Sequence, residues 1–140
     1  MQRLIAASLI VLVLLIGGAG FGFWTYRQNR EHPVFVPLQV NPSTSVAKRE
    51  EIAKDLKAKL SEPEFLLKVS KKVGLKDKWQ LDSDEAGAVE LERRLFVNVT
   101  ETTVNIGVNG KRKERIVSGE VVKQLMEEVG KILGIKLPTK

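Results

Sequence analysis

The chain has 140 residues, which is enough for one modest domain. It contains no cysteine, so disulfides and thiolate chemistry are excluded. The net charge is +6, but its sign alternates, because residues 79–110 are acidic whereas the stretches on either side are basic. Alternating sign is typical of solvated helix faces. Aromatic residues do not interleave with the basic ones as they do in single-strand binders, so nucleic-acid binding is not expected.

An uncharged, apolar run covers residues 4–26, after a short tail at residues 1–3. About 20 such residues in a helix cross a hydrocarbon core of roughly 30 Å. The run ends in aromatic residues followed by Arg27, which is typical of an uncleaved anchor. A signal peptide cleaved near Ala19 is the alternative, but the apolar run continues past that site. We therefore predict a transmembrane anchor at residues 4–26 in contact with membrane lipid, and a soluble domain at residues 27–140.

Residues 32–40 are predicted to be extended. Three valines and a phenylalanine favour a strand, and Pro33 and Pro37 confine it to an edge or an irregular strand. The polar residues 41–45 then predict a turn that offers several helix caps.

An amphipathic helical pattern follows over residues 46–73. The sequence SEPE within it predicts a restart, with Ser61 as the cap, Pro63 in the first turn and Glu64 completing a capping box. Gly74, followed by a leucine, indicates a helix C-terminus. This stretch is thus predicted to form two helical segments joined by a kink.

A loop is predicted at residues 76–81, with Trp79 covering the core. Asp82 or Ser83 is predicted to cap a third helix. Apolar and polar residues then alternate from 97 to 108, which predicts strand interrupted around Glu101-Thr102.

Asn109-Gly110 is a hairpin signal when it stands between strands. The apolar residues beyond it recur at helical spacing, however, so we predict Asn109 as a cap and a helix over residues 111–133 with Gly119 as its weak point. The order strand, helix, helix, helix, strand, helix predicts an α+β domain with helices packed on a sheet, following one N-terminal transmembrane helix.

No catalytic set is expected. A nucleophile needs a base within reach, and the single histidine, His32, is interpreted as a solvated residue near the membrane surface. Asp82, Asp84 and Glu85 lack the glycine turn and the distal glutamate of a calcium loop, so they are interpreted as a helix N-terminus. We predict no catalytic, cofactor-binding or metal-binding residues, and no enzyme activity.

Two further stretches have a structural and a functional interpretation. Residues 107–111, GVNGK, lack the spacing of a phosphate loop and are predicted to be a turn. The basic run at residues 111–115, KRKER, could contact lipid headgroups or an acidic polymer. It lies far along the chain from the apolar run and contains Glu114, so a solvated helix start is the favoured interpretation.

Several motifs occur in a recognisable order. The first strand is followed by NPSTS, then by SEPEFLLKVSKKVGLKDKW with its K-x-G-L pattern at residues 72–75 and Trp79, and then by ELERRLFVNVTETTVNIGV ahead of a long helix. From about Pro33 to Leu133 the chain resembles the membrane-proximal domain of the Wzz-type polysaccharide co-polymerases, the bacterial chain-length determinant family. Family members continue into a long arm and a second span, and neither is expected from this sequence.

The resemblance implies a single-pass protein of the bacterial inner membrane, with its C-terminal domain in the periplasm. It also implies self-association in rings, as a homo-oligomer, and polysaccharide polymerase or export proteins as partners. We therefore predict a membrane-anchored domain, similar to a truncated chain-length determinant, that acts by assembly or binding in polysaccharide export. The alternative is a generic anchored adaptor that binds another cell-envelope protein.

Overall fold

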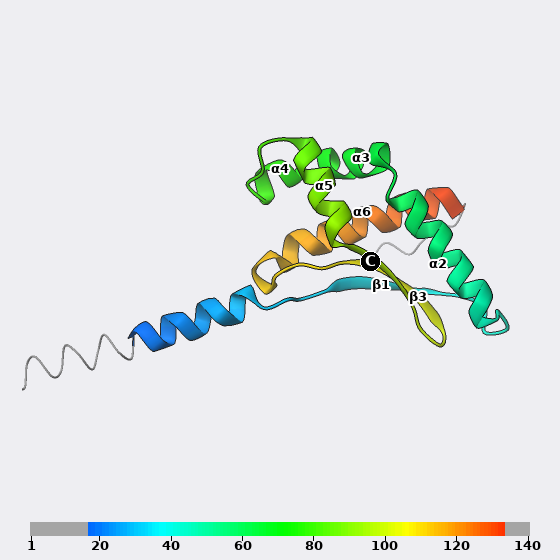
Figure 1. Ribbon diagram of the computed structural model, residues 1–140, viewed down its shortest axis with the longest axis horizontal. Coiled ribbons are helices and arrows are strands. Elements are labelled where there is room, and N and C mark those ends of the chain that lie inside the picture. The colour runs from blue at the N-terminus through cyan, green and yellow to red at the C-terminus, as the bar shows by residue number, and fades with distance from the viewer. Residues whose placement is uncertain (1–16, 134–140) are drawn as a thin grey trace, which may run out of the picture.

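A three-stranded antiparallel sheet forms the base on which the helices pack in the computed structural model, which describes residues 17–133 (Figure 1). Residues 17–29 form a helix that projects from one end of the sheet. The elements after it are β1 (Val34–Gln39), α2 (Val46–Leu60), α3 (Pro63–Val73), α4 (Leu75–Lys78), α5 (Asp84–Arg94), β2 (Leu95–Val99), β3 (Thr103–Val108), the 3₁₀ turn η1 (Arg112–Glu114) and α6 (Arg115–Leu133).

The sheet has the order β1-β3-β2, so the last strand in the sequence lies in the middle. Val34 pairs with Val108 in β3, and Val108 pairs with Leu95 in β2 on the other side. Side chains alternate across the sheet, so one face carries only aliphatic residues, namely Val34, Val36, Leu38, Leu95, Val97, Val99, Val104, Ile106 and Val108. This face forms one wall of the core.

All the helices of the domain lie on the aliphatic side of the sheet (Figure 1). α6 packs on β1 and β3, α2 packs on β2, and α3 packs on both α5 and α6. Val121, Leu125 and Val129 of α6 are fully buried, because they fall on the stripe of that helix that faces the core. The helices therefore all lie on one side of the sheet, and α6 lies between the sheet and α3 (Figure 1).

Three of the predicted helix signals are confirmed. Pro63 occupies the first turn of α3, and Gly74 ends that helix in the left-handed region at φ 72°. Ser83 caps α5, since its hydroxyl accepts from the N–H of Ala86. The predicted cap at Ser61 is wrong, because Ser61 ends α2 and Glu62 precedes α3 without a side-chain cap.

The predicted order of elements is wrong in two places, and one predicted helix cap is also wrong. The interrupted strand at residues 97–108 is a hairpin of two strands, because the chain turns at Glu101-Thr102 and Thr100 N–H donates to Thr103 O at 2.8 Å. Part of the predicted loop at residues 76–81 belongs to the short helix α4. Asn109 does not cap the last helix, because its N–H donates to Arg94 O and so extends the sheet.

The predicted transmembrane helix at residues 4–26 is also corrected. Among residues 17–133, no helix is long and apolar enough to cross a membrane. Residues 4–16 of the predicted span lie outside this range, and residues 17–26 belong to the projecting helix. The described fold is an α+β domain with a small three-stranded sheet.

Arg94, the last residue of α5, forms ion pairs that link α5 to η1, directly before α6. Its guanidinium pairs with Glu90 at 2.6 Å and with Glu114 at 2.8 Å, and it lies 4.3 Å from the ring centroid of Trp79. Trp79 is partly buried against the core, as predicted. Burial raises the pKa of Glu114, but the Lys111 N–H and Arg94 outweigh it and hold that pKa below its ordinary value. The connection between β3 and α6 is therefore fixed by charge-assisted hydrogen bonds.

Candidate functional site

The residues weighed for chemistry in the sequence do not gather into one site. His32 continues the sheet, because its N–H donates to Gly110 O at 2.7 Å. Asp84 and Glu85 occupy the first turn of α5. A backbone hydrogen bond and the Ser83 hydroxyl lower the pKa of Glu85, as expected of a carboxylate at a helix N-terminus. Across residues 17–133, no group of three histidine or acidic side chains could hold a metal ion.

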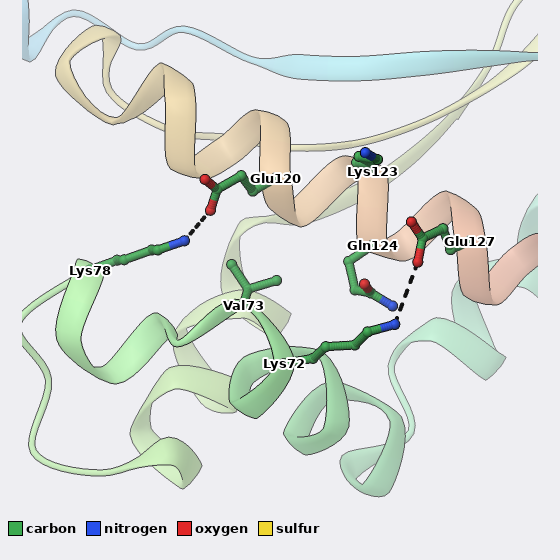
Figure 2. Close-up of a pocket in the computed structure, with 7 residues that line it drawn as sticks. All are labelled: Lys72, Val73, Lys78, Glu120, Lys123, Gln124 and Glu127. Atoms are coloured by element: carbon green, nitrogen blue, oxygen red, sulfur yellow. Dashed lines mark hydrogen bonds and ion pairs between the residues drawn. The ribbon is translucent and has the colours of Figure 1, made fainter. Parts of the chain in front are cut away.

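A shallow groove of about 240 Å³ runs between α3, α4 and α6 (Figure 2). Lys72 reaches across it to Glu127 at 3.5 Å, and Lys78 pairs with Glu120. These ion pairs join residues that are more than 40 positions apart, so they hold α3 and α4 against α6. We interpret the groove as a contact between helices, in which two lysines pair with two glutamates.

The outer face of the sheet is the part of the domain that no described helix covers (Figure 1). It consists of the side chains that alternate with the aliphatic ones, namely Phe35, Pro37, Gln39, Phe96, Asn98, Thr103, Asn105 and Gly107. We call this set the open face. It is a mixed surface of aromatic, amide and hydroxyl groups, and none of its side chains is ionisable.

Two phenylalanines meet over a glycine at one end of the open face. Phe35 in β1 and Phe96 in β2 both stand opposite Gly107 in the central strand, and their ring centroids lie 6.4 Å apart in an edge-to-face arrangement. A Cβ atom on Gly107 would lie 2.4 Å from Val34 O and 2.7 Å from the tip of the Phe96 ring. The rings therefore close over the central strand only because residue 107 has no side chain.

The remainder of the open face is polar apart from Pro37. Asn105 lies in the central strand, between Pro37 of β1 and Asn98 of β2. Its amide oxygen accepts from the Thr103 hydroxyl at 3.0 Å. Phe35 is 48% exposed, so nearly half of this large apolar side chain remains in contact with water. Aromatic residues are enriched and charged residues are depleted at the buried centre of protein interfaces, and the open face shares both features.

Prolines limit pairing at the β1 edge of the sheet. His32 N–H points toward β3, and antiparallel pairing alternates, so odd-numbered residues of β1 direct their backbone groups away from the sheet. Pro37 occupies one of those positions, and Pro33 occupies the equivalent position just before β1. Neither residue offers an N–H there. A neighbouring strand would thus find few donors at this edge, which favours contact through the open face over extension of the sheet.

Sequence reasoning missed the open face as a unit. The alternation in residues 95–99 and 103–108 does separate an aliphatic set from a second set, and a glycine inside a strand is a sign of close approach. Phe35 and Phe96 are 61 positions apart in the sequence. Their contact depends on the strand order, which places β3 between β1 and β2. Only the pairing register brings these residues together.

No family model, curated protein or solved structure matches the chain. The resemblance to the chain-length determinants therefore stays a prediction from the motifs of the sequence.

Proposed function

We propose that this chain is a non-catalytic assembly module whose open face packs against the open face of a second copy. The supporting observation is the Phe35–Phe96 pair, a partly exposed aromatic contact on a sheet face that no described element covers. The apolar surface of an uncovered face of this kind is removed from water only when another molecule packs on it.

The absence of charge on the open face favours a second copy as the occupant. A two-fold interface places the same patch on both sides, so any ionisable group near its centre meets its own like charge. The open face has no ionisable side chain, although the chain as a whole carries a net charge of +6. Face-to-face packing therefore brings no like charges together at its centre.

The resemblance of the sequence to the chain-length determinants suggests where such assembly would act. We propose a role in polysaccharide export at the bacterial cell envelope, with polymerase or export proteins as further partners. Contact through one two-fold face gives closed pairs, whereas a ring needs head-to-tail contacts through a second surface. Cross-linking in cells followed by identification of the partners tests this role, and partners from unrelated envelope complexes would favour a general adaptor.

Light scattering coupled to size-exclusion chromatography tests assembly directly. We expect the full chain in mild detergent to show a protein mass of two or more copies. Phe35→Asp places a carboxylate on each side of the proposed interface and should shift the chain to the mass of one copy. Val89→Asp is a matched control, since Val89 is 66% exposed on α5 and lies away from the open face.

A single-copy mass for the unmodified chain across micromolar concentrations would contradict the proposal. Equal behaviour of the two aspartate variants would contradict the choice of the open face. Circular dichroism of each variant shows whether its fold is intact, so that loss of assembly and loss of folding are distinguished.

A further inference from the structure

The start of α6 and the end of the projecting helix lie side by side, although about 80 residues separate them in the sequence (Figure 1). Glu31 forms an antiparallel bridge with Lys111. The Arg112 N–H donates to Arg30 O at 3.0 Å, and the His32 N–H donates to Gly110 O. The two segments are therefore joined by backbone hydrogen bonds, which fix their relative position.

This junction collects basic side chains from both segments. The cations are Arg27, Arg30, Lys111, Arg112, Lys113 and Arg115, and all six residues are exposed. We call this set the basic junction. No ion pair within 4.0 Å involves any of the six among the described residues.

The acidic residues of the same segments do not neutralise it. Glu114 points back to the domain, where it pairs with Arg94 at 2.8 Å and accepts from the Lys111 N–H at 3.0 Å. Glu31 is then the one carboxylate of the two segments that is left beside six cations. In the sequence, Glu114 suggests that the KRKER run is partly neutralised. In the structure Glu114 pairs with Arg94 instead and leaves the cations of the run unpaired among the described residues.

Exposed apolar side chains border the basic junction. Ile116 follows the basic run and is 79% exposed, and Trp24 and Tyr26 of the projecting helix are more than half exposed. The Arg30 guanidinium lies 5.2 Å from the centroid of the Tyr26 ring. Tryptophan and tyrosine favour the headgroup level of a bilayer, where an apolar ring and a polar group are both accommodated.

We propose that the basic junction docks on an anionic phospholipid surface. Clustered lysine and arginine are attracted to lipid phosphates, and nearby apolar side chains enter the boundary between headgroups and acyl chains. This inference is independent of the proposed assembly, because the basic junction lies at the end of the sheet and not on the open face. Docking on lipid also accounts for the clustering of cations at the point where the projecting helix joins the domain.

A fluorescent label tests this docking at a chosen position. The chain has no cysteine, so Ile116→Cys gives a single site for an environment-sensitive dye in the full chain. We expect its emission to shift to the blue on vesicles of phosphatidylcholine with phosphatidylglycerol, and much less on phosphatidylcholine alone. Val46→Cys is the control, because Val46 is 57% exposed and is the first residue of α2. β1 leads away from the basic junction toward the start of α2 (Figure 1).

Charge variants provide the second arm of the test. Arg112→Gln/Lys113→Gln should weaken the anionic-lipid partitioning of the chain about thirtyfold, and raised salt should weaken it further. Lys54→Gln/Lys57→Gln removes the same charge from exposed positions on α2 and should leave the partitioning on anionic vesicles unchanged. Equal spectra for labels at positions 116 and 46, or equal partitioning of the two double variants, would overturn the proposal.

Discussion

The two faces of the sheet use the same three strands in opposite ways. The inner face has nine aliphatic side chains that α2 and α6 cover, and Val104, Ile106 and Val108 of its central strand are fully buried. The outer face has aromatic and amide groups over Gly107, and none of the described helices reaches it. The comparison separates residues whose role is folding from residues that remain available for contact with another molecule.

Residues on the two faces of the sheet should therefore differ sharply in their effect on stability. Ile106→Ala should lower the free energy of unfolding by about 2–5 kcal/mol, because it leaves a cavity between the central strand and α6. Phe35→Ala, on the open face, should lower it by about 1 kcal/mol, the order of one aromatic pair. Urea unfolding followed by circular dichroism measures both. Equal losses would show that the two faces are not distinct.

Trp79 lies at the rim of the core, so its effect should be intermediate. Trp79→Ala should cost about 2–3 kcal/mol, since the ring is partly exposed but packs on the core and stacks under Arg94. Trp79→Phe should recover most of this loss because it keeps an aromatic ring at the site. A change below about 0.5 kcal/mol for Trp79→Ala would show that the ring does not contribute to the core.

A smaller effect is expected at the ion-pair cluster that fixes the connection to α6. The side chain of Arg93, and then Arg94, lowers the pKa of Glu90 to about 2 from its ordinary value of 4.5. The folded state therefore binds this proton less tightly than the unfolded state, so the stabilisation is complete above pH 4.5 and is lost as the pH falls toward 2.

Glu90→Gln should consequently cost about 1 kcal/mol at neutral pH, a value reduced for solvent screening of a partly exposed pair. The difference between the variant and the unmodified chain should shrink between pH 4.5 and pH 2. Glu92→Gln is a control on the same helix, because Glu92 is exposed and makes no ion pair within the described residues. A difference that stays constant with pH would contradict the role of the Glu90 carboxylate.

Local signals in the sequence account for the parts of the fold that were predicted correctly. Gly74 ends α3 and Ser83 caps α5 because both effects depend on residues within one turn. The hairpin was missed because Glu101-Thr102 lacks the glycine or asparagine of a tight turn, so the alternation read as one interrupted strand. Asn109 is predicted as a helix cap because the apolar residues beyond it recur at helical spacing. Its hydrogen bond to Arg94 O, 15 positions away, cannot be inferred from that local pattern.

The candidate surfaces were harder to predict than the fold for the same reason. The open face depends on the placement of β3 between β1 and β2, and the basic junction depends on the bridge between Glu31 and Lys111. The KRKER run is visible in the sequence, but its distance along the chain from the apolar run and the presence of Glu114 favour a solvated helix start. The bridge between Glu31 and Lys111 brings the two segments together in space.

Cross-linking at the centre of the open face is the most direct test of the account. Asn105 lies in the middle strand of that face, and the chain has no cysteine of its own, so Asn105→Cys places a single thiol there. We predict that a short bis-maleimide joins two copies of this variant rapidly and that Val89→Cys, on exposed α5, reacts without forming pairs. Equal yields of cross-linked pairs from the two variants, or none from Asn105→Cys, would contradict the claim that the open face is the assembly surface.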